Sequence, residues 1–236
     1  MCPFTLGHDS IEKKKKNWLN YLGGFMLRYL LAMFYSIFAF GLAYANDSEL
    51  MTWTYNVTFQ PIQIEGALEG CSLVFNAVKA DFVYLNGALI VANGNISVGA
   101  NNGVLALMLK VGIKELLGDK KMVRPNFAYL QTANYSTAGV QQKSTDGDEG
   151  YKLYFYPFDD NAIMSLFEEM IRVEKVTLAF NRKKGGMDVL IPIEFDIAES
   201  NVVGNKVNRV RTNKTMSDFT GCFGKLLEQA KSSLKK

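Results

Sequence analysis

Histidine is almost missing from this chain of 236 residues, because the only one is His8. This residue lies in a leader that we expect to be removed, so the working protein should contain no imidazole group. The absence excludes Ser-His-Asp and Cys-His catalysis and histidine-ligated zinc, each of which requires a neutral imidazole. Carboxylate, lysine and tyrosine chemistry and oxygen-ligated cations such as calcium stay open.

Long apolar runs are also scarce, and the one at residues 29–45 carries no charge. Four lysines at positions 13–16 and Arg28 precede this run, and it ends in the small-x-small sequence Ala43-Tyr44-Ala45. This pattern predicts a signal peptide at residues 26–45 that is cut after Ala45. Residues 1–25 would then be an extension ahead of a true start at Met26. An uncleaved membrane anchor is the alternative, because the run is close to the length that spans a bilayer.

Cysteine is rare as well, and only Cys71 and Cys222 lie outside the leader. An exported chain meets an oxidising compartment, which predicts one disulfide between these residues, 151 positions apart. Two free buried thiols are the alternative. A catalytic thiol has no histidine to activate it. We therefore expect a periplasmic or extracellular protein.

Net charge disappears with the leader. The chain has 26 basic and 23 acidic residues; five and two of them lie in residues 1–45, which leaves 21 of each. A neutral protein has no global attraction to nucleic acid or to an acidic membrane. We expect no nucleic-acid partner, no membrane contact after cleavage, and a single domain over residues 46–236.

Strand patterns dominate the first half of this domain. Residues 52–59 alternate between large apolar and polar side chains, which predicts a strand that Pro61 ends. Asn86-Gly87 and Asn93-Gly94 predict two tight turns in a meander. Residues 105–111 should form a strand that leads into a turn or helical piece ending at 118, with a helix throughout as the alternative. The polar residues 131–150 predict a long loop.

The second half adds two helices and a hairpin. We expect an amphipathic helix at about 159–170, capped by Asp159 or Asp160, and a second one at about 217–233. Residues 173–181 and 187–197 should form a hairpin around a turn at 183–186. Hairpins without β-α-β alternation predict a mainly β (α+β) protein, an antiparallel sandwich or curved sheet with two packed helices.

Aromatic and basic side chains provide two candidate binding sites. The strand at 151–157 places Lys152, Tyr154 and Tyr156 on one face, where they could bind a glycan ring or a protein partner. Burial of both faces of this strand is the alternative. A cluster without acids could bind an anionic group, although a solvated loop also explains it; its members are Lys206, Arg209, Arg211 and Lys214.

Acidic side chains provide the remaining candidates. Asp146, Asp148 and Glu149 have the alternate spacing of calcium ligands, but they lack the twelve-residue pattern with its distal glutamate, so a solvated turn is the simpler interpretation. The pairs at 159–160 and 168–169 could supply acid and base groups. Helix capping and a solvent-exposed helix face explain them equally well.

No nucleophile motif, nucleotide loop or metal-thiolate cluster occurs in the sequence, and no cofactor is implied. We therefore expect an exported β-rich protein that acts by binding or assembly with a protein or glycan partner. A carboxylate-dependent hydrolase of cell-envelope glycan, with residues 131–150 as its lid, is the alternative from a different class. A membrane-tethered accessory protein with an uncut leader is the third hypothesis.

Overall fold

The computed structural model describes residues 48–101, 104–118, 121–140, 143–158 and 160–233. The predicted signal peptide and the extension ahead of it lie outside these residues. Residues from Glu49 onward form one compact unit, which is mainly β with antiparallel sheets and two packed helices, as the sequence predicts. Within the described ranges, no helix is both long enough and apolar enough to cross a bilayer.

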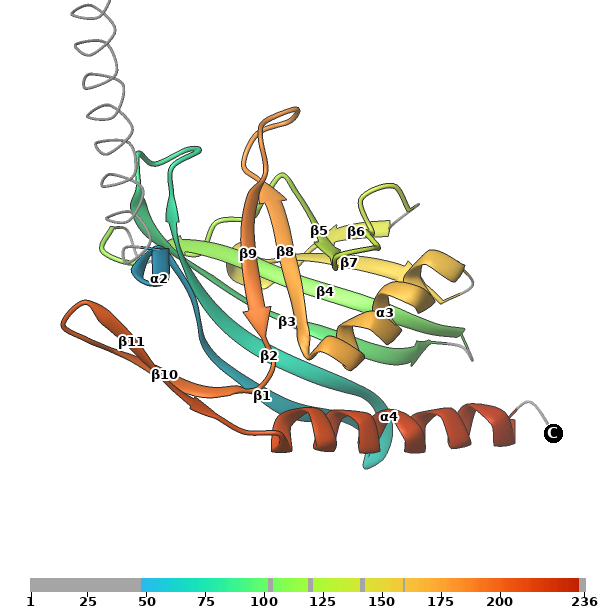
Figure 1. The fold of residues 1–236 in the computed structure, drawn as a ribbon. Helices are drawn as coiled ribbons and strands as arrows, with labels where there is room; N and C mark the ends of the chain where they lie inside the picture. The colour runs from blue at the N-terminus through green and yellow to red at the C-terminus, as the bar shows by residue number, and fades with distance from the viewer. Residues whose placement is uncertain (1–47, 102–103, 119–120, 141–142, 159, 234–236) are drawn as a thin grey trace, which may run out of the picture. The chain divides into compact units, whose positions relative to one another are not determined.

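The larger of the sheets has six antiparallel strands in the order β1-β2-β3-β4-β7-β6 (Figure 1). The first four are long and joined as a meander: β1 (Thr52–Ile64), β2 (Ala67–Asp81), β3 (Ala88–Asn101) and β4 (Val104–Glu115). The short strands β7 (Lys152–Pro157) and β6 (Lys143–Asp146) complete it. Since β1 stands at one end of this order, one side of its backbone faces no strand of the sheet.

Two local predictions in the meander are wrong. Pro61 does not end β1, which continues to Ile64 because an edge strand tolerates a residue without an N–H group. Asn93-Gly94 is not a turn but the middle of β3. A Cβ atom at Gly94 would lie 2.0 Å from the carbonyl oxygen of Lys110, so this glycine permits a close approach to β4. The turn at Asn86-Gly87 is confirmed, with positive φ at both residues.

For residues 105–118 the sequence left strand and helix open. The structure has strand β4 up to Glu115 and no helix in this segment. The expected loop at 131–150 is also more ordered than predicted. It includes a bridge between Gln131 and Ser136, strand β6 and the short 3-10 helix η1 (Asp148–Gly150).

A second sheet of three strands crosses the large sheet steeply (Figure 1). It consists of β5 (Phe127–Gln131), β8 (Lys175–Asn181) and β9 (Val189–Glu194), and β8 and β9 form the predicted hairpin with Gly185 in its turn at positive φ. A separate two-stranded hairpin follows, built from β10 (Ile197–Val203) and β11 (Lys206–Arg211). A short helix, α2 (Ser48–Met51), precedes β1.

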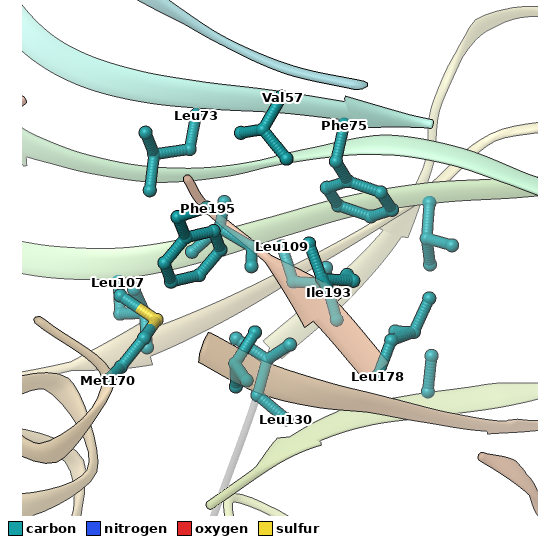
Figure 2. Close-up of a cluster of buried hydrophobic side chains, with 14 of the residues drawn as sticks. Val57, Leu73, Phe75, Leu107, Leu109, Leu130, Met170, Leu178, Ile193 and Phe195 are labelled. Atoms are coloured by element: carbon teal, nitrogen blue, oxygen red, sulfur yellow. The ribbon is translucent and has the colours of Figure 1, made fainter. Parts of the chain in front are cut away.

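The core lies between the two sheets and the helices. Side chains of the large sheet point toward those of β5, β8, β9 and α3 (Figure 2), and the labelled members include Leu73, Phe75, Leu109, Leu178 and Ile193, all fully buried. Burial on this scale is the main driving force for the fold.

The two predicted helices are α3 (Asn161–Val173) and α4 (Lys214–Ser233). Asp160 caps α3 by accepting a hydrogen bond from the Ala162 N–H at 2.7 Å, as one of the two predicted caps. Both helices bury apolar faces in the common core, for example through Leu166 in α3 and through Phe219 and Leu226 in α4. Each helix also borders a hollow at the surface.

Candidate binding groove

A disulfide fixes α4 to the large sheet. Cys71 in β2 and Cys222 in α4 are bonded, with their Cα atoms 6.0 Å apart, so the predicted pair is present. Cys71 is fully buried and Cys222 is nearly so. The covalent link therefore determines where α4 lies over the ends of β1 and β2.

A groove of about 870 Å³ runs between α4 and β1. Its floor comes from β1 and the start of β2, at Phe59, Pro61, Gln63 and Leu68. Its wall is one stripe of α4 that recurs every three or four residues: Ser217, Asp218, Gly221, Cys222, Lys225, Glu228, Gln229 and Ser232. The volume lies within the range of about 300–1,000 Å³ that is typical of ligand sites.

The floor of this groove is partly apolar and its wall is polar. Asp218 is neutralised by Lys214, with the Lys214 Nζ 2.5 Å from the carboxylate. Lys225 and Glu228 are exposed and form no ion pair with another described residue. The groove thus offers apolar surface together with one free charge of each sign.

Helix α4 contains two glycines, of which only Gly221 lines the groove. Gly221, in the groove, and Gly224, one turn on, would each have an added Cβ with no atom within 4 Å. Packing therefore does not require a glycine at either position, although glycine inside a helix is less stable than alanine by about 0.8–1 kcal/mol. At Gly221 the missing side chain keeps the groove wide.

The candidate ligand site on β7 is not at the surface. Tyr154 and Tyr156 share a face with Lys152, as predicted, but this face points into the core and both tyrosines are buried. Burial also raises the pKa of Tyr156 to about 12. Lys152 donates a hydrogen bond to the Asn126 carbonyl oxygen at 2.8 Å. The structure thus gives the alternative that the sequence left open, in which these large aromatic rings serve the core and not a solvent face.

The predicted cationic cluster is mostly a strand and not a loop. Lys206, Arg209 and Arg211 lie in β11, where alternation places Lys206 on the opposite face from the two arginines. Arg211 is paired with Glu194 at 2.9 Å and with Asp196 at 2.5 Å, and hydrogen bonding to Asp196 raises its pKa. Lys214 begins α4 and pairs with Asp218. The four residues therefore do not form one open anion-binding patch.

The acidic turn is organised around an arginine. Arg124 lies 3.4 Å from the Asp146 carboxylate and donates hydrogen bonds to the carbonyl oxygens of Gly147, at 2.8 Å, and Tyr151, at 3.0 Å. Its guanidinium group thus pairs with the Asp146 carboxylate and holds the turn through backbone oxygens. Asp148 and Glu149 lie in η1. Nowhere in the described ranges do three His, Cys, Asp or Glu side chains form a group that could hold a metal ion.

A smaller hollow of about 260 Å³ borders α3, lined by Asn134, Tyr135, Ser165, Glu168, Glu169 and Arg172. Glu168 is exposed, but Glu169 is buried, so the prediction of a solvent-exposed face is wrong for Glu169. Its carboxylate accepts hydrogen bonds from the Thr132 hydroxyl at 2.5 Å and the Asn134 side-chain amide at 2.7 Å. These bonds, that of Thr132 above all, hold the pKa of Glu169 below its usual value. The carboxylate anchors the 132–134 segment to α3.

Sequence reasoning missed the groove. It treated Pro61 as the end of a strand and considered only the apolar face of α4, whereas Pro61 and the polar stripe of this helix line the groove together. The two glycines inside a helical pattern were a usable signal, because glycine in a helix without a packing reason calls for explanation.

No protein-family model matches this chain, and neither the curated proteins nor the solved structures contain a match to it.

Proposed function

We propose that this protein is exported to the periplasm or the extracellular space and acts there by binding a partner in the groove between α4 and β1. The observation that carries the proposal is this groove of about 870 Å³, with its partly apolar floor and its two free charges. Export is supported by the leader pattern of residues 26–45 and is compatible with the Cys71–Cys222 disulfide.

The proposal is tested with two variants on the same helix. Gly221→Trp should fill the groove, whereas Gly224→Trp adds the same ring next to the groove without being part of its lining. Secreted protein labelled with 15N is titrated with two defined probe sets, a pool of random dodecapeptides and soluble cell-envelope oligosaccharides. We expect shifts at residues that line the groove, which Gly221→Trp abolishes and Gly224→Trp retains.

Equal response of the wild type and Gly221→Trp to both probe sets would contradict a binding role for the groove. Equal melting temperatures of the two tryptophan variants show that a loss of binding is not a loss of folding. The export part has its own test, because N-terminal sequencing of the secreted protein should begin at Asn46 or a neighbouring residue, and an intact leader would overturn it.

A further inference from the structure

The edge of β1 beside the groove is open. Its first half is covered by other elements, because the Ser200 hydroxyl donates to the Thr54 carbonyl oxygen at 2.8 Å and the Glu194 N–H donates to the Thr54 hydroxyl at 2.9 Å. Residues 57–64 pair only with β2 and make no backbone hydrogen bond to any other described residue. Their outward N–H and C=O groups are therefore available to a further strand.

This edge carries only part of the usual protection against pairing. Native edge strands are commonly short or carry charged side chains. At the other end of the large sheet, β6 follows this rule with four residues that include Lys143 and Asp146. In contrast, β1 has 13 residues and not one charged side chain. Two features do blunt this edge: Pro61 has no N–H to offer, and the pairing with β2 shifts register between Thr54 and Asn56 and again between Ile62 and Gln63.

The groove and the open edge belong to the same residues. Phe59, Pro61 and Gln63 alternate along β1 and direct their side chains to the groove floor. A proline in an edge strand is expected to turn its missing N–H away from the ladder, so Phe59 and Gln63, two residues to either side, should present their backbone groups to the open edge. A strand added there would place every second side chain against α4.

We infer that the groove binds an extended peptide, which adds as a strand to residues 57–64 of β1 and places alternate side chains between β1 and α4. The inference rests on the proposed function, since it names the partner of that same groove. Main-chain hydrogen bonds to the β1 edge hold the peptide, and the groove reads its side chains.

Charge complementarity defines the peptide further. Lys225 and Glu228 are three residues apart on α4, about 4.5 Å along the helix axis, and neither is paired within the described chain. Alternate residues of a strand are about 6.6 Å apart and face the same side. A peptide with an acidic and a basic side chain two positions apart matches these charges, with an uncharged side chain in the space left by Gly221.

The test starts from a displayed library of random dodecapeptides selected on the wild-type protein alone. Selected peptides are synthesised, and their dissociation constants are measured by fluorescence polarisation. We expect Gly221→Trp to weaken binding at least about tenfold, and methylation of every second peptide nitrogen to weaken it about two- to tenfold for each hydrogen bond lost. Lys225→Glu should weaken binding about two- to fivefold, as expected for an exposed ion pair.

Hydrogen exchange supplies a readout that does not depend on affinity. Bound peptide should slow exchange of the Phe59 and Gln63 amides, whereas the amides of β6 should not change. Peptides that bind in the groove without an effect of N-methylation and without this protection would overturn strand addition.

The two proposals fail in different ways. If only oligosaccharides bind and Gly221→Trp blocks them, the peptide inference is wrong and the binding groove stands. If neither probe set is sensitive to Gly221→Trp, both proposals are wrong. The Gly224→Trp variant should bind selected peptides like the wild type, which separates filling of the groove from a general effect on α4.

Discussion

The two helices cover the same core but meet the surface differently. Around α3, the hollow is small and its buried carboxylate, Glu169, is saturated with hydrogen bonds from the 132–134 segment. Around α4, the groove is more than three times as large, and a covalent bond rather than a polar network holds the helix. A covalent anchor needs no polar partner, and Lys225 and Glu228 beside it form no ion pair within the described chain. This difference is why we propose a binding site at α4 and not at α3.

The largest effect that tests this comparison is loss of the disulfide. The Cys71→Ala, Cys222→Ala double variant should lower the free energy of unfolding by about 3–5 kcal/mol, because the bridge closes a long loop in the unfolded chain. Urea unfolding measures the change, and the reducing agent dithiothreitol should lower the wild type's stability in the same way. A variant with wild-type stability would show that noncovalent packing already holds α4.

Truncation of one leucine in each helix sharpens the contrast. Leu166→Ala in α3 and Leu226→Ala in α4 both empty space in the core, where such changes cost about 2–5 kcal/mol. We expect Leu226→Ala to lie at the lower end, since its helical neighbours Cys222 and Gln229 line the open groove and the site can relax. Urea unfolding of both variants measures the difference. A larger cost at Leu226 would contradict the view that α4 is the more loosely packed helix.

Because the Glu169 carboxylate anchors the 132–134 segment to α3, we expect the contribution of this contact to stability to depend on pH. Because the folded-state pKa of Glu169 is lowered, its contribution to stability is complete above pH of about 4.5 and is lost as the pH falls through the folded-state pKa. Glu169→Gln should therefore be less stable than the wild type at pH 6, and the difference should shrink toward pH 3. Urea unfolding across this range measures it. Glu168→Gln, at an exposed neighbour, should show no such trend; if both variants behave alike, the anchor is wrong.

Local sequence patterns predicted much of this fold because local physics decides it. A few residues are enough to predict three of its features: the alternation along β1, the Asp160 cap and the Cys71–Cys222 disulfide. The failures have tertiary causes. Gly94 looks like a turn residue, but the Lys110 carbonyl oxygen of the neighbouring strand requires it. Residues 206–211 look like a solvated loop because they carry charged side chains, but they form strand β11.

The groove between β1 and α4 could not be predicted in the same way. It is a space between β1 and α4, which are about 150 residues apart in the sequence and meet through the disulfide to β2 and the packing of α4 in the common core. Nothing in the local pattern of either element indicates how closely the other approaches. The prediction that Glu169 is exposed to solvent failed for a related reason, since its hydrogen-bond partners Thr132 and Asn134 lie in a segment whose sequence looks like a plain loop.

The smallest predicted effect separates the structural role of the α4 glycines from a functional one. Gly221→Ala and Gly224→Ala should each stabilise the protein by about 0.5–1 kcal/mol, because alanine has the higher helix propensity and its Cβ meets no atom at either site. Thermal unfolding measures both variants. If Gly221→Ala destabilises the protein while Gly224→Ala stabilises it, Gly221 has a structural reason that the open groove does not show. If both stabilise the protein, stability explains the glycine at neither position. Only Gly221 lines the groove, so the peptide-binding test then decides whether its missing side chain serves a ligand.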